Sequence, residues 1–186
     1  MLKLLLPEVG FIALMLATLI SAMTCIVVLV GSRRLWLGIA QIAVFGTWCY
    51  SGLLAVAFSL LTLGFVVDDF SVVDIAQHSH SALPPLMKIA QVWGGHEGSL
   101  LLWLVCLAGW STLFGSHYRR ETDSVFPLTL AMLAGLLALL LLFVVLGSDP
   151  FVRIFPPAIE GRDLNPMLQH PGLIFHPPLL YMGYSG

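Results

Sequence analysis

Histidines are the residues of this chain whose side chains could bind a metal or a cofactor, because the neutral imidazole is a common ligand. Five of the six fall in two polar stretches, and the sixth, His117, lies beside two arginines and is expected in headgroup water. The five are His78, His80, His96, His170 and His176. They are the first candidates for chemistry.

Two short histidine patterns approach metal-binding motifs without completing one. His78-x-His80 has a spacing that could chelate a metal, but no cysteine or third ligand stands nearby, which favours a polar surface turn. His96-Glu97 does not extend to H-E-x-x-H, because the fifth position is Leu100. We predict no metal site here, and the first four of the five histidines are left without an assigned role.

The three cysteines exclude two redox classes. Cys25, Cys49 and Cys106 are far apart and form neither a C-x-x-C pair nor a C-x-x-C-H haem attachment site. The sequence is therefore not that of a c-type cytochrome or a disulfide oxidoreductase. No phosphate-binding loop or Ser/His/Asp arrangement is present either, so no catalytic residue is predicted.

His176 differs from the other histidines because it precedes Pro177-Pro178. A residue before proline is kept out of the α region, and proline is favoured at the first helical position, so His176 is expected at a helix cap. A neutral imidazole held at an apolar boundary suits an axial ligand to haem. Capping the helix or hydrogen bonding to a loop carbonyl is the alternative.

Composition defines the elements that must hold these residues. The chain is 59% hydrophobic and 10% charged, with a mean hydropathy of +0.96, whereas globular domains are about 25% charged. Residues 9–30, 35–67, 98–116 and 125–147 contain no Lys, Arg, Asp or Glu. Each run reaches the roughly 17–25 residues that a membrane-spanning helix needs. We predict an all-α integral membrane protein.

Charges and helix breakers set the expected bounds of the spans. The pair Arg33-Arg34 must separate the first two, and Gly147-Ser-Asp-Pro150 ends the fourth. Four complete transmembrane helices are expected at about 8–30, 36–64, 98–115 and 125–147, and a fifth, incomplete one begins near 177.

The loops predict an orientation. Arg33, Arg34, Arg119 and Arg120 lie in short connections, whereas the two long loops, about 65–97 and 148–176, hold few basic residues. Basic residues concentrate in short cytoplasmic loops. The N-terminus and both long loops are therefore expected outside, in the periplasm of a Gram-negative cell. Membrane lipid is an expected partner and nucleic acid is not.

Four long motifs are distinctive. They are Trp93-Gly-Gly-His-Glu-Gly-Ser-Leu-Leu-Leu-Trp103, the preceding Asp69-Phe-Ser-Val, Asp163-Leu-Asn-Pro-Met-Leu-Gln169 and Pro171-Gly-Leu-Ile-Phe-His-Pro-Pro-Leu-Leu-Tyr-Met-Gly-Tyr184. Together they resemble CcmF, the haem lyase subunit of the bacterial cytochrome c maturation system. The similarity runs from Leu6-Pro-Glu to the last residue.

The resemblance implies attachment of haem, in transit as b-type haem, to apocytochrome c at the outer face of the bacterial inner membrane. In that family haem arrives on the chaperone CcmE, and CcmH and CcmI deliver the apocytochrome. Two external histidines hold the haem, and the first falls in the F-H-P-P motif, which makes His176 the expected axial ligand. The stretch from Trp93 to Ser99 is expected to be structural or to serve in docking.

Members of the family are several times longer, and their Trp-rich haem platform and second histidine lie beyond residue 186. We expect a fragment rather than one piece of a split lyase, and we do not expect these residues alone to catalyse ligation. The alternative is a non-catalytic scaffold, or a transporter or respiratory-complex subunit without a cofactor. Transport would favour ionisable groups within the spans, and these spans have none.

Overall fold

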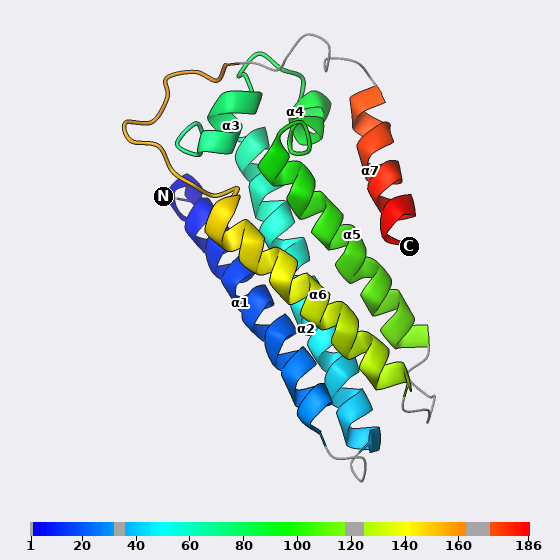
Figure 1. Ribbon diagram of the computed structural model, residues 1–186. Helices are drawn as coiled ribbons and strands as arrows, with labels where there is room; N and C mark the ends of the chain where they lie inside the picture. Colours follow the sequence, from blue (N-terminus) through cyan, green and yellow to red (C-terminus); the bar gives the residue numbers. More distant parts are fainter. Residues whose placement is uncertain (1, 32–35, 118–124, 163–171) are drawn as a thin grey trace.

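Helices make up most of the part of the chain that the structure describes. The computed structural model describes residues 2–31, 36–117, 125–162 and 172–186 (Figure 1). The helices are α1 (Leu2–Val30), α2 (Trp36–Val66), α3 (Val73–His78), α4 (Pro85–Gln91), α5 (His96–His117), α6 (Val125–Gly147) and α7 (Gly172–Ser185). Within these ranges the β structure is one isolated bridge, between Val72 and Arg153. The predicted all-helical fold is confirmed.

The four predicted spans are the four long helices. α1, α2, α5 and α6 are each long and apolar enough to cross a membrane. α6 ends at Gly147, where the Gly-Ser-Asp-Pro break was expected. α1 begins earlier than predicted, with Pro7 inside it, and α5 extends two residues further at each end than the predicted 98–115. This chain is a membrane protein.

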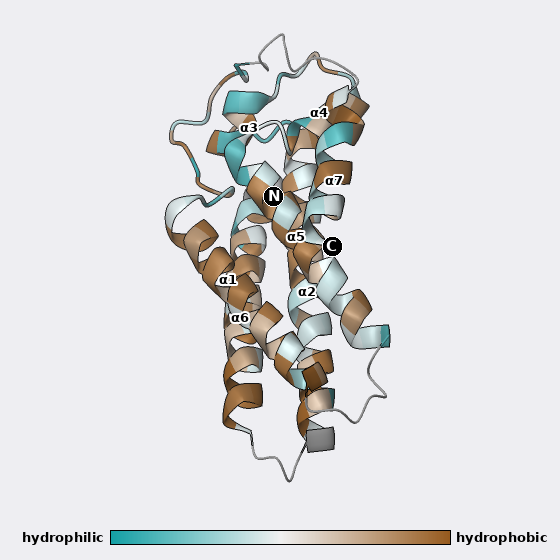
Figure 2. Cartoon of the chain, turned by 45° about the vertical axis from the view of Figure 1, so that its right-hand side comes forward, coloured by the Kyte–Doolittle hydropathy of each residue, from teal (hydrophilic) through white to brown (hydrophobic). Residues whose placement is uncertain are grey.

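The long helices pack into a bundle with an apolar interior and an apolar exterior. α1 packs against α2 and α6, and α2 packs against α5. Their interface buries Leu14, Tyr50, Leu101 and Leu137 completely or nearly so. The opposite faces carry exposed large side chains such as Phe45, 71% exposed. Helices that are hydrophobic on every face suit a lipid environment. Figure 2 colours hydrophobic residues brown, and this colour is clearest along α1 and α6.

The two long loops pack together at one end of the bundle, which is also the end where α1 begins (Figure 1). The Val73 amide donates to the Val152 carbonyl at 2.8 Å, and the Arg162 amide donates to the Ala76 carbonyl at 2.9 Å. We call residues 67–95 and 148–162 together the cap. The predicted loops thus share one end with the N-terminus, and the side of the membrane that this end faces stays a prediction.

α7 begins earlier than the sequence predicted. A start near 177 would have placed His176 at the cap, but the helix runs from Gly172, so His176 lies in its second turn with Pro177 and Pro178 inside the helix. The prediction assumed that both prolines must occupy the first turn, where a missing N–H costs nothing. The Leu173 carbonyl, which Pro177 leaves without an amide donor, accepts a hydrogen bond from the Trp93 side chain instead.

Candidate functional site

His176 lies on the exposed side of a helix that is attached to the bundle along only one face. α7 packs against α5 and, at its upper end, against α4, and it buries none of its residues. The His176 side chain is exposed. No hydrogen bond to its imidazole is recorded from any residue that the structure describes. The ring is therefore accessible to a ligand or a partner approaching α7 from outside the bundle.

Exposed apolar side chains lie near His176 along α7. Leu179 and Leu180 follow His176 by three and four residues, which places them on its side of the helix. They are 66% and 54% exposed, and the neighbouring Phe175 is 65% exposed. Haem needs an axial nitrogen together with hydrophobic contact for the porphyrin. The residues around His176 fit that group.

One hydrogen bond joins the upper end of α7 to the segment between α4 and α5. The Trp93 indole nitrogen Nε1 donates to the carbonyl oxygen of Leu173 at 2.7 Å. In a regular helix that carbonyl would accept from the amide of residue 177, four positions later. Position 177 is proline, which has no N–H. Trp93 thus replaces the donor that Pro177 lacks.

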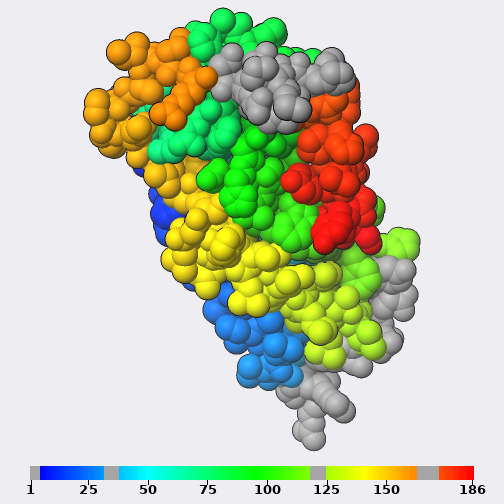
Figure 3. All heavy atoms as spheres, turned by 45° about the horizontal axis from the view of Figure 1, so that its top comes forward, coloured from blue at the N-terminus to red at the C-terminus, as the bar shows by residue number. Residues whose placement is uncertain are grey.

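Two further tryptophans, both from α5, contact the lower part of α7. The Trp110 Nε1 donates to the carbonyl oxygen of Met182 at 2.9 Å, where the helix ends and its carbonyls lack helical partners. The Trp103 and Tyr184 rings lie 6.2 Å apart between centroids. Figure 3 shows α7, in red, lying on the surface beside α5. Indole groups therefore attach α7 at both of its ends.

The segment that carries Trp93 is fixed by close backbone packing. A Cβ at Gly95 would come within 2.8 Å of the His78 ring, and one at Gly98 would lie 1.7 Å from the Val92 carbonyl oxygen. Only glycine allows these approaches. Trp93 itself is half-buried against the main core. The glycine-rich motif is thus a tight turn that anchors the indole.

The half-buried His78 pairs with the buried Asp74 beside this turn. Its Nδ1 lies 2.9 Å from the Asp74 carboxylate oxygen Oδ1. The hydrogen bond with Asp74 raises the pKa of His78, and burial raises the pKa of Asp74. Both shifts favour retention of protons by the folded cap. His78 is therefore occupied by a structural contact rather than presented to a ligand.

The remaining histidines are dispersed. The His80 Nδ1 accepts a hydrogen bond from the Ala82 amide at 3.2 Å. His96 is exposed at the start of α5, and His117 is exposed at its other end. His170 lies outside the described residues. Among the described residues, no three His, Cys, Asp or Glu side chains are grouped to hold a metal ion.

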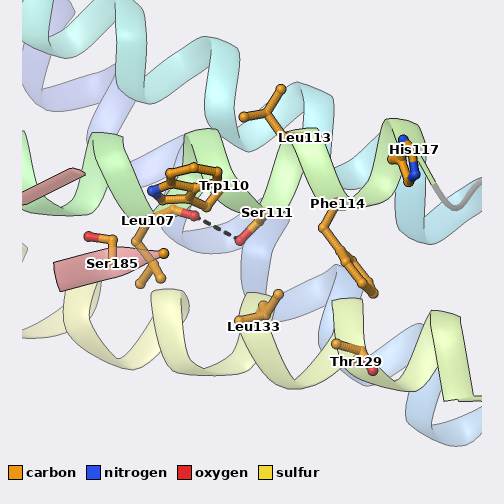
Figure 4. A pocket seen from close by; sticks show the side chains of 10 residues that line it. Leu107, Trp110, Ser111, Leu113, Phe114, His117, Thr129, Leu133 and Ser185 are labelled. Atoms are coloured by element: carbon orange, nitrogen blue, oxygen red, sulfur yellow. Dashed lines mark hydrogen bonds between the residues drawn. The ribbon is translucent and has the colours of Figure 1, made fainter. Parts of the chain in front are cut away.

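Two hollows border the bundle. An apolar one of about 510 Å³ lies between α5, α6 and the end of α7, and Figure 4 shows Phe114 pointing from α5 toward α6 within it. A smaller one of about 380 Å³ lies beside the cap and is lined by Asp74, Glu97 and Asp149. Neither hollow is lined by His176.

The sequence places this arrangement in a known family. A family model described as cytochrome C assembly protein matches residues 93–186, which include the Trp93 segment, α5, α6 and α7. The chain belongs to the cytochrome c assembly protein family. The boundary of the match coincides with Trp93, so the indole and the helix that it contacts lie within the shared region.

Curated relatives have names from cytochrome c biogenesis. The chain is 63% identical over 156 residues to the probable cytochrome c-type biogenesis protein NrfE of Escherichia coli K12, covering 84% of this chain. It is 42% identical over 184 residues to the cytochrome c-type biogenesis protein CcmF of Pseudomonas aeruginosa, covering 97% of this chain. It spans 28% of the length of each. The resemblance to CcmF seen in the sequence motifs is confirmed.

A solved structure has the same fold. The protein titled cytochrome c heme lyase CcmF superimposes with a TM-score of 0.72 over 98% of this chain and 28% of its own length. The two are 19% identical in sequence, so this match supports the arrangement of helices and nothing finer.

Sequence reasoning assigned Trp93 to a structural or docking segment without finding its partner. A signal was nevertheless present, because any helix through Pro177 and Pro178 must leave the carbonyls of Leu173 and Ile174 without amide donors. A nearby tryptophan N–H is a natural replacement for such a donor. The spacing alone could not show which tryptophan reaches α7.

Proposed function

We propose that this chain is the N-terminal part of a haem lyase and that His176 supplies one axial ligand to haem during its attachment to apocytochrome c. Haem is the substrate here, carried as b-type haem before the thioether bonds form. The observation that carries the proposal is the exposed imidazole bordered by exposed leucines on α7. Family membership, which gives the pathway, supports it independently.

The family and the fold support the rest of the proposal, which concerns orientation and partners. The cap and the N-terminus lie on the periplasmic side of the bacterial inner membrane. Haem is received from the chaperone CcmE, and CcmH and CcmI present the apocytochrome. The short basic connection at Arg33-Arg34 supports this orientation.

In this arrangement the residues of this chain bind and orient haem rather than react with it. His176 donates a nitrogen lone pair to the iron, and Leu179 and Leu180 supply apolar contact. The second axial ligand comes from polypeptide beyond residue 186.

The test is the haem spectrum of the native full-length protein together with its haem chaperone. We expect His176→Ala to abolish the bis-histidine signal and to stop cytochrome c maturation. His96→Ala is the matched control, because His96 is also exposed at the cap end but lies on α5. A His176→Ala protein with an unchanged spectrum and normal maturation would leave a non-catalytic scaffold as the better account.

A further inference from the structure

We propose that Trp93 is a positioning residue for His176, fixing the height and rotation of the turn of α7 that carries the imidazole. This role rests on the proposed function, because it affects haem only if His176 is the ligand. Its basis is the 2.7 Å bond from the indole to the Leu173 carbonyl, three residues before His176. The contact therefore lies within one helical turn of the ligand.

The bond exists because two sequence features coincide. Pro177 removes the amide that would otherwise occupy the Leu173 carbonyl, and the adjacent residue is His176. A carbonyl without a donor is unfavourable in apolar surroundings. The same proline that follows the ligand thus creates the acceptor by which Trp93 holds the helix.

Other contacts of α7 with α5 lie further along the helix. The Trp110 bond to Met182 and the Trp103–Tyr184 ring contact restrain its C-terminal half, and α7 buries no residue. A slip of one residue moves a helix by about 1.5 Å along its axis and turns it by about 100°. Either displacement would break a bond whose length must stay within about 3.2 Å. The Trp93 bond therefore favours one register at the turn of α7 that carries His176.

Trp93 is itself a rigid reference point. Its ring packs against the main core, and the segment after it is held by the close approach of Gly98 to the Val92 carbonyl. The chain then enters α5 directly at His96. The turn that carries His176 is thereby connected to the membrane bundle through the Trp93 side chain.

The experiment compares haem affinity and haem reduction potential in the native full-length protein with its chaperone. Trp93→Phe keeps an aromatic ring and deletes the donor. We expect haem affinity to fall about three- to tenfold, the range that one hydrogen bond supports, and the potential to shift. Trp110→Phe is the matched control, because it deletes the donor to Met182 at the far end of α7. It should leave both readouts unchanged.

A second variant separates positioning from simple helix stability. Pro177→Ala in the Trp93→Phe background returns an amide to the Leu173 carbonyl but does not reconnect α7 to the bundle. Persistent loss of affinity in this double variant supports positioning. Recovery to the native value, or a Trp93→Phe protein with native affinity and potential, overturns it.

Two further outcomes keep the inference distinct from the proposed function. If His176→Ala leaves the haem spectrum unchanged, the proposed function fails and the positioning role fails with it. If His176→Ala abolishes the signal while Trp93→Phe has no effect, only the positioning role fails. Should Trp93→Phe not insert into the membrane, 3-benzothienylalanine at position 93 serves, because it keeps the bicyclic ring and has sulfur in place of the N–H. The expected result is again weaker haem binding, and native binding overturns the role.

Discussion

The Arg153 guanidinium donates hydrogen bonds to both carboxylate oxygens of Glu8, a residue 145 positions earlier in the chain. Its Nε and Nη2 donate at 2.7 and 2.8 Å, and Nη1 donates to the Ser71 hydroxyl at 2.9 Å. One side chain therefore connects the start of α1 to both halves of the cap. Bidentate arginine–carboxylate pairs are stronger and more directional than single ion pairs.

Removing that guanidinium should lower the stability of the protein modestly. The Glu8 side chain is 48% exposed, so solvent screening limits the cost of Arg153→Gln to about 1 kcal/mol. The measurement is the thermal unfolding midpoint in detergent. Arg162→Gln removes the same charge from the same loop and should change the midpoint less. Equal shifts in the two variants would refute a specific role for the Glu8 contact.

Gly98→Ala should be strongly destabilising, because its Cβ would lie 1.7 Å from the Val92 carbonyl oxygen. Relieving that overlap requires backbone movement, and we expect a loss of about 2–4 kcal/mol in unfolding free energy. Gly109 lies in the same helix, and a Cβ there would meet nothing within 4 Å. Gly109→Ala should therefore cause no loss, and comparable losses in both variants would contradict the steric explanation.

Stability should fall as the pH rises above about 6.5, the ordinary pKa of His78. The bond with Asp74 raises the folded-state pKa of His78, so its contribution is complete below that pH and is lost as the pH passes the raised value. The raised pKa of the buried Asp74 also makes stability fall as the pH rises. His96 and Glu97 are the other charged groups that act on Asp74. Unfolding midpoints between pH 5.5 and 8 should show this slope, and His78→Gln should flatten it. An equal slope in both proteins would show that another titratable group causes the pH dependence.

Lys88 should be required for a stable cap. It is 7% exposed and pairs with Asp68, whose backbone has a φ of 54°. Lys88→Met leaves the carboxylate without its cation and should cost about 3 kcal/mol, near the lower end for a broken buried pair. Adding Asp68→Asn removes the stranded charge and tolerates the left-handed backbone, so it should restore part of the loss. A double variant no more stable than Lys88→Met would show that the charge is not the cause.

The sequence predicted features that depend on local composition. The charge-free runs gave the four spans, and the break at Gly147 was placed correctly because Gly-Ser-Asp-Pro ends a helix whatever surrounds it. The start of α7 was wrong, because the rule placed both prolines in the first turn, whereas the helix begins at Gly172 and contains them. That rule also could not predict the bond that the Leu173 carbonyl accepts from Trp93, 80 residues away. The Asp74–His78 pair was missed for a different reason. Its spacing of four residues on a helix was visible, but the burial that gives it weight depends on the glycines of the next segment.

The His176 assignment depended on the family resemblance rather than on spacing. Its neighbours Leu179 and Leu180 could be assigned to its side of the helix only once α7 was known to pass through both prolines. The exposure of all three side chains could be known only from the structure, because it depends on which face of α7 packs against α5.

The pairing of the two halves of the cap also has a consequence during synthesis. Val73 bonds to Val152, about 80 residues later in the chain. At translation rates of about 5–20 residues per second, the first half must wait roughly 4–16 s for its partner to emerge. During that interval residues 67–95 lack the segment that later bonds to Ser71, Val73 and Ala76. A part of the chain that is covered in the finished cap is thus open to proteases and chaperones while the protein is being made.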